Sequence, residues 1–174
     1  KHAEDFNKKG LALEILTVDN SADGIWIYNK LRDIDRGRAE QALEMLEANG
    51  GNRSGEALGS IDHLGNVYAD QFLRGHPLGN LLEKSFSKIW LDPDNDLLQG
   101  LRNRSKFIKG RCGKCRLFAL CNGNVRARAE AAYGDIWAED PACYLSDEEI
   151  YGKGELTPCL LGDDPRLQSE MPAL

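Results

Sequence analysis

The chain has 174 residues, 41% of them hydrophobic, and a formal net charge of -6 at pH 7. The acidic balance argues against general nucleic-acid binding, which needs a basic surface, and no apolar run approaches the roughly 18 residues of a membrane span. The sequence opens with neither an initiator Met nor a signal segment. We therefore expect a cytoplasmic protein and a cut through a longer chain, although a processed N-terminus would look the same.

The first part of the chain, residues 1–58, has the pattern of a strand followed by a helix. Residues 11–18 resemble a buried strand of a parallel sheet, and apolar spacing predicts a helix over 38–48. This β/α unit fits the end of a partial TIM-like barrel. Asp19 and Asn20 follow the strand, where barrel side chains face the active site, so they are candidate site residues. A helix N-cap or turn pair is the alternative.

Residues 59–145 indicate a small domain made of a β-hairpin and short helices. Two β segments, 57–62 and 67–72, flank a turn that contains Gly. Short helices are then predicted at 85–91, 94–103 and 124–133. From Ser146 the chain is acidic and contains three prolines, so residues 146–174 are expected to form a loosely packed tail. The predicted fold class is α+β.

Four of the five cysteines have the spacing of one metal-ligand set, C-x2-C, then x5, then x21. They are Cys112, Cys115, Cys121 and Cys143. The sequence lacks secretion signals, which favours a metal site over disulfides in an interaction domain. Residues 102–116 carry many basic side chains and no acid, and nearby positive charge lowers a thiol pKa. The spacing leaves zinc and a [4Fe–4S] cluster equally open. Cys159 lies outside the pattern and is interpreted as a free thiol.

The cysteine segment, with Gly-Asn-Val-Tyr at 65–68 and Asp-Pro-Ala-Cys at 140–143, resembles the SPASM domain. This is the C-terminal auxiliary-cluster extension of radical S-adenosylmethionine (SAM) enzymes. The full pattern has seven cysteines for two auxiliary clusters. Here Asp70 and Val125 stand at two cysteine positions, and the window of x9–15 before Gly65 contains no cysteine. The lost ligands all belong to the first cluster, so the resemblance implies one [4Fe–4S] cluster on the four remaining cysteines. Zinc is possible there in aerobic preparations.

Within that superfamily the chain is similar to the tetrapyrrole-modifying branch over most of residues 11–150. The segments that carry this similarity are 17–20, 61–67, 70–72 and 126–131. The resemblance implies a siroheme-derived tetrapyrrole substrate, an electron donor, and SAM with a second [4Fe–4S] cluster on a C-x3-C-x2-C loop. That loop is expected before residue 1. The chain is therefore expected to contain no catalytic residue and to be inactive alone.

Two reactions of this branch are candidates for the whole enzyme. The heme d1 biosynthesis member, which removes propionate side chains from 12,18-didecarboxysiroheme, is the first expectation. The alternative is a radical SAM enzyme of the siroheme-dependent heme pathway that removes acetate groups from the same substrate. A zinc-ribbon-like binding module with no redox role is a further alternative, because four thiolates also suit tetrahedral zinc.

A carboxylate-rich substrate implies arginines that grip carboxylates through two hydrogen bonds. The candidates are Arg102, Arg104, Arg126 and Arg128. For Arg126, a helical i,i+4 pair with Glu130 is the alternative. His63 lies in the predicted turn and His76 precedes a proline, so both are expected to be structural or exposed and not metal ligands.

Overall fold

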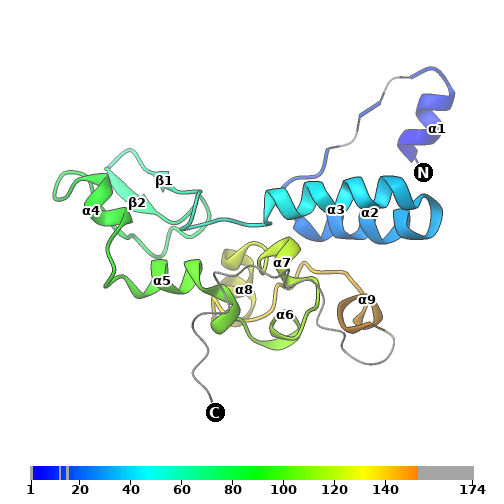
Figure 1. Cartoon of the computed structure of the whole chain (residues 1–174). Helices are drawn as coiled ribbons and strands as arrows, with labels where there is room; N and C mark the ends of the chain where they lie inside the picture. Colours follow the sequence, from blue (N-terminus) through cyan, green and yellow to red (C-terminus); the bar gives the residue numbers. More distant parts are fainter. Residues whose placement is uncertain (1, 12, 15, 153–174) are drawn as a thin grey trace, which may run out of the picture.

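The computed structural model describes residues 2–11, 13–14 and 16–152, and it combines short helices with a small sheet (Figure 1). The helices and strands are α1 (His2–Lys8), α2 (Ser21–Ile34), α3 (Arg36–Asn49), β1 (Ser60–Ile61), β2 (Asn66–Tyr68), β3 (Gly79–Asn80), α4 (Phe86–Trp90), α5 (Asp96–Arg102), a 3-10 turn at Arg104–Lys106, α6 (Gly110–Gly113), α7 (Phe118–Cys121), α8 (Arg126–Tyr133) and α9 (Asp147–Tyr151). This mixture fits the predicted α+β class. None of the described helices has the length and apolar character needed to cross a membrane.

The two long helices, α2 and α3, form a hairpin that packs on α7 (Figure 1). Asp35 joins them, because its carboxylate accepts a hydrogen bond from the Arg38 amide, 3.1 Å away, and caps α3. Gly50, with φ 67°, ends α3 in the left-handed conformation. The predicted helix over 38–48 is thus confirmed, and α2 was missed.

The predicted strand over 11–18 is wrong for its described residues, which belong to no strand. Leu16 and Val18 are 77% and 78% exposed. A buried parallel strand needs neighbouring strands on which to pair, and the three strands in the described part of the chain pair only with one another.

The sheet has the order β1-β2-β3 and is antiparallel throughout. Its first two strands confirm the predicted hairpin, whereas β3 was missed. Asp62 closes the turn between them, since its carboxylate accepts hydrogen bonds from the amides of Leu64 and Asn66, both at 2.9 Å. The helices predicted at 85–91 and 94–103 correspond to α4 and α5, and the one at 124–133 to α8.

Two apolar clusters hold the chain together. One lies below the sheet around Ala69, Leu73 and Leu101. The other joins α2 to the cysteine segment and includes Ile25 and Ile150. Ile150 belongs to α9, so the prediction of a loosely packed tail from residue 146 is wrong for this helix. A capping box starts α9, and burial of Ile150 at 1% exposure fixes it. Residues 153–174, with Cys159, lie outside the described residues.

Candidate metal centre

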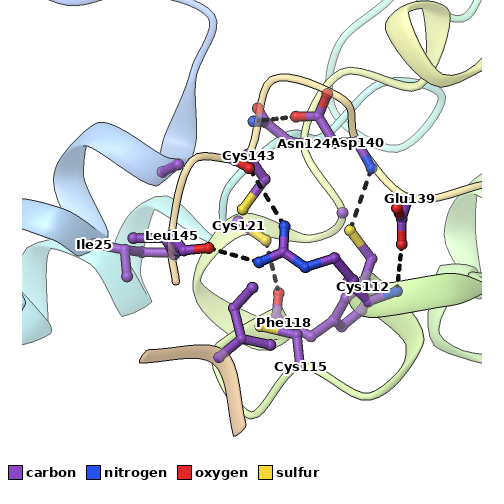
Figure 2. Close-up of a pocket in the computed structure, with 14 residues that line it drawn as sticks. Ile25, Cys112, Cys115, Phe118, Cys121, Asn124, Glu139, Asp140, Cys143 and Leu145 are labelled. Atoms are coloured by element: carbon purple, nitrogen blue, oxygen red, sulfur yellow. Dashed lines mark hydrogen bonds between the residues drawn. The ribbon is translucent and has the colours of Figure 1, made fainter. Parts of the chain in front are cut away.

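The four predicted ligand cysteines line one cavity at the junction of α2 with the cysteine segment (Figure 2). Each comes from a different local element, namely α6, the turn after it, the end of α7 and the turn before α9. They are Cys112, Cys115, Cys121 and Cys143, all free thiols. Ile25 and Leu145 cover the apolar side of this cavity. In the described ranges, no three His, Cys, Asp or Glu side chains are already arranged to hold a metal ion.

Close backbone approaches bring the cysteines together. A Cβ atom on Gly113 would lie 2.6 Å from the carbonyl oxygen of Ile108, so only glycine fits between the first two cysteines. A Cβ atom on Gly51 would lie 2.6 Å from the Cα atom of Cys121. Gly51 also has φ 67°. The amide of Asn52 then donates to the carbonyl of Cys121 at 3.1 Å. The segment after α3 is therefore fastened to a ligand residue.

Two sulfur atoms accept hydrogen bonds from backbone amides. The amide of Asp140 lies 3.4 Å from Cys112 Sγ, and that of Leu117 lies 3.4 Å from Cys115 Sγ (Figure 2 shows the first). Amide donors favour the thiolate form, and hydrogen bonds to sulfur tune the potential of a cluster that thiolates hold. The surroundings of these two thiols are thus suited to a bound metal centre.

The prediction that neighbouring basic residues lower the thiol pKa values is wrong for three of the cysteines. Burial raises the pKa of Cys115 to about 11 and that of Cys121 to about 12, and it also raises the pKa of Cys112. Loss of hydration outweighs the opposing charges of Arg116 and Arg126. In the metal-free chain these thiols are protonated at neutral pH, so metal binding releases protons.

Asp140 connects two of the cysteines. Its side chain is 1% exposed and accepts hydrogen bonds from Arg128 Nε at 3.1 Å, Arg128 Nη2 at 2.9 Å and Asn124 Nδ2 at 2.6 Å. Its amide donates to Cys112 Sγ, and its carbonyl accepts from the Cys143 amide at 3.1 Å. Fixing this one aspartate therefore orients two of the four candidate ligands. In the sequence, Asp140 stands out only as part of the motif at 140–143, and Asn124 carries no signal.

The predicted site residues Asp19, Asn20 and Arg128 join this network. Arg128 Nη1 donates to the carbonyl of Asp19 at 2.7 Å, and Asn124 Nδ2 donates to Asn20 Oδ1 at 2.8 Å. Asn20 also accepts from the Ala22 amide, so the N-cap alternative is confirmed. The structure thus joins three candidates from two distant parts of the sequence to Asn124 and Asp140, which line the cysteine cavity, although the three do not line it themselves. Their hydrogen bonds are structural.

Two of the other candidate arginines, Arg104 and Arg126, are buried. Arg126 is 0% exposed and donates to the carbonyls of Ile136 and Ala138 at 3.1 Å and 2.6 Å, and to that of Gly123. Arg104 is 2% exposed. The expectation that these two bind substrate carboxylates is wrong here, because both are buried and their Nη atoms donate to backbone carbonyls.

Arg102 and the two histidines also have structural surroundings. Arg102 donates to the carbonyls of Gly55 and Trp90 at 3.0 Å and 2.6 Å. His76 Nε2 contacts the carboxylate of Glu130, so this glutamate joins α8 to the loop before β3. His63 is exposed in the turn, as expected.

Asp70, at which the resemblance expects a cysteine, belongs to a buried polar cluster. Asp70 and Ser54 are both 0% exposed, and Ser54 Oγ lies 2.5 Å from Asp70 Oδ2. Asp70 Oδ1 accepts from the amides of Phe72 and Leu73 at 2.7 Å and 2.8 Å. Arg104 Nη2 donates to the Ser54 carbonyl at 2.7 Å. Ser54 lies in the window before Gly65 in which the pattern of the resemblance expects its first cysteine. That position could have marked Ser54 as a partner of Asp70.

Comparison with known proteins finds relatives of this chain. The chain is 48% identical over 147 residues to Fe-coproporphyrin III synthase of Methanosarcina barkeri, covering 83% of this chain and 37% of that protein. It is 40% identical over 147 residues to pre-heme d1 synthase of Dinoroseobacter shibae, covering 84% and 36%. The chain is a homologue of radical SAM enzymes of heme synthesis.

A third relative agrees with this assignment. The AdoMet-dependent heme synthase of Methanosarcina barkeri is 40% identical over 65 residues, which is 37% of this chain and 18% of that protein. The chain thus spans little more than a third of the length of the curated relatives it matches. No family model matches the chain, and no solved structure matches it either.

Proposed function

We propose that the chain is the auxiliary-cluster segment of a radical SAM enzyme that modifies a tetrapyrrole. The observation that carries the proposal is the cavity lined by four cysteines from four local elements, in a homologue of enzymes of heme synthesis. Residues 1–58 would be the end of a TIM-like barrel and 59–145 a SPASM-type domain. The SAM-binding loop and its cluster would belong to the rest of the enzyme, and the chain alone would be inactive.

The chemistry of the donors fits a [4Fe–4S] cluster. The ligands would be Cys112, Cys115, Cys121 and Cys143, which are partly buried in a cavity with apolar side chains on one side. When bound, such a cluster supplies one-electron chemistry. The protein residues would have three tasks, namely to hold four thiolates, to donate backbone hydrogen bonds to sulfur and to keep solvent out.

Substitution of single cysteines tests this assignment. Cys112→Ala, Cys121→Ala and Cys143→Ala should each abolish the full cluster after anaerobic reconstitution, and Cys159→Ala should keep it. Iron and sulfide analysis measures the outcome, and visible absorbance supports it. A full cluster in the Cys143→Ala variant would contradict the ligand assignment. Zinc without sulfide in every preparation would instead favour the zinc-ribbon-like module, since four thiolates also suit zinc.

The substrate of the whole enzyme is proposed to be a siroheme-derived tetrapyrrole. The relative with 48% identity is named for Fe-coproporphyrin III and the one with 40% for pre-heme d1. The higher of these two sequence identities favours the siroheme-dependent heme pathway over the initial expectation of heme d1 biosynthesis. The full-length enzyme, incubated with 12,18-didecarboxysiroheme, SAM and a reductant, decides between them by mass spectrometry. Loss of acetate groups supports the former, loss of propionate side chains the latter, and an unchanged substrate contradicts both.

A further inference from the structure

We propose that the surface over the Cys112–Cys115 turn docks an acidic electron-carrier protein. We call this surface the docking face and define it by a shallow groove together with Lys106 and Lys114. The proposal rests on the proposed function, because a carrier has a reason to dock there only if these cysteines hold a cluster. It adds the place of contact and the chemistry of the partner.

The groove brings two candidate ligands to the outside of the molecule. It shares Cys112 and Cys115 with the covered cavity, and Gly113 between these two cysteines also lines it. Ile108, Phe118 and Ala119 add apolar surface to it. A small apolar centre of this kind, close to a redox group, is suited to a transient protein contact.

Two exposed lysines stand next to groove-lining residues in the sequence. Ser105 and Gly113 line the groove, and their sequence neighbours Lys106 and Lys114 are both exposed. Within the described residues neither lysine has an ion-pair partner, unlike Lys109, which pairs with Asp135 at 2.6 Å. Two positive charges are thus available to a partner at this groove.

Arg116 adds a third basic group that lines the groove itself. The Nε atom of Arg116 donates to the backbone carbonyl of Glu149 at 3.0 Å, and this hydrogen bond anchors the side chain. The acceptor is a carbonyl and not a carboxylate, so this contact leaves the positive charge of Arg116 in place. The anchored arginine and the two free lysines therefore form a basic rim around an apolar centre.

The charge of this face is opposite to that of the chain. The whole chain carries -6, whereas residues 102–116 contain seven basic residues and no acidic one. Arg104 is buried, and Lys109 and Arg111 pair with Asp135 and Asp147, so the unpaired positive charge of this face lies on Lys106, Lys114 and Arg116. A positive patch on a negatively charged chain orients an acidic partner and raises its association rate, and this effect weakens as the ionic strength rises. The remaining negative surface repels an extended polyanion such as a nucleic acid, so a compact acidic protein is the favoured occupant.

A binding titration with flavodoxin as the probe tests the proposal. The cluster-loaded chain is titrated into flavodoxin at low salt, and flavin fluorescence gives Kd. Lys106→Glu with Lys114→Glu should weaken binding at least about ten-fold and flatten its salt dependence. Lys84→Glu with Lys88→Glu makes the same charge change on exposed residues at α4 and should leave Kd within about two-fold of the unmodified chain.

Three results would overturn the docking face. They are the absence of flavodoxin binding at low salt, equal loss in both double variants, and equally tight binding of a single-stranded oligonucleotide to the same lysines. Iron and sulfide measured on the same samples keep the two proposals apart. A chain that holds no cluster contradicts the proposed function, whereas a loaded chain that fails the charge comparison contradicts the docking face alone.

Discussion

Two regions of the molecule bury reactive and polar side chains in opposite ways. In the cysteine region, residues 110–152, four thiols line a cavity under apolar cover. In the hairpin region, residues 52–80, the carboxylate of Asp70 is buried against Ser54. The cysteine region has the donors for a metal centre, whereas the hairpin region is joined by hydrogen bonds between its own residues.

The hairpin region shows how buried hydrogen bonds can stabilise a small unit that has no metal ligands. The hairpin region contains strands of only two or three residues, which alone are marginally stable. The Asp70 carboxylate stabilises this region by accepting hydrogen bonds from the Ser54 hydroxyl and from two backbone amides. We therefore expect the hairpin region to be stable without metal and the cysteine region to depend on it.

The largest expected effect is at the seam between the regions. Gly51→Ala places a methyl group against the Cys121 backbone at φ 67° and should cost roughly 3 kcal/mol of unfolding free energy. Gly134→Ala is a matched control, since Gly134 also has φ 67° but has open space around its Cβ position. It should cost about 1 kcal/mol. Urea unfolding measures both, and equal losses would mean that the close approach to Cys121 is unimportant.

The next effect separates stability from metal binding. Asp70→Ala removes the acceptor for three buried donors and should lower the unfolding free energy by about 2 kcal/mol, with unchanged iron content per folded chain. Ser54→Ala, which removes one hydroxyl from the same cluster, should cost about 1 kcal/mol. Urea unfolding and iron analysis are measured on the same preparations. Loss of iron in the Asp70 variant would show that the two regions are not independent.

A smaller effect is expected at the wall of the cavity. Asp140→Asn weakens the acceptor of Arg128 and loosens the segment that orients Cys112 and Cys143, so a chelator should remove iron roughly ten-fold faster. Asp94→Asn changes the same group at an exposed position before α5 and should have no effect. The decay of visible absorbance in excess chelator gives the rates. Indistinguishable rates would remove Asp140 from its positioning role.

The smallest effect concerns the hairpin turn in acid. Hydrogen bonds from Asn66, then from Tyr68 and Leu64, lower the pKa of Asp62 from 3.8 to about 2. A lowered folded pKa means that this contribution to stability is complete above pH 3.8 and is lost as the pH falls through about 2. Asp62→Asn should remove this part of the acid dependence. Urea midpoints of both proteins between pH 2 and 5 test it, and parallel curves would contradict it.

The local signals in the sequence were sufficient for much of this structure. Turn chemistry at Gly65 predicted the hairpin, apolar spacing with a Gly stop predicted α3, and an Ala-rich run with a Gly stop predicted α8. The grouping of the four cysteines followed from their spacing and agrees with the shared cavity. The strand at 11–18 was wrong, because a continuous apolar run specifies a buried strand only when neighbouring strands are present.

The long-range features required the structure. Asn124 and Asp140 are polar residues of common type, and nothing in their spacing shows that they bridge Asn20 to the cysteine cavity. Buried arginines are equally hard to foresee, since most arginines are exposed and the Nη atoms of Arg126 donate to carbonyls whose positions depend on the fold. The thiol pKa values were missed for the same reason, because burial is a tertiary property.

The most direct test of the account is the metal content of the chain purified without exposure to oxygen. Four cysteines holding one [4Fe–4S] cluster predict about four iron and four sulfide per chain, with broad visible absorbance, and no more than traces of zinc. About one zinc per chain with no sulfide, obtained under the same anaerobic conditions and after reconstitution with iron and sulfide, would contradict the central claim.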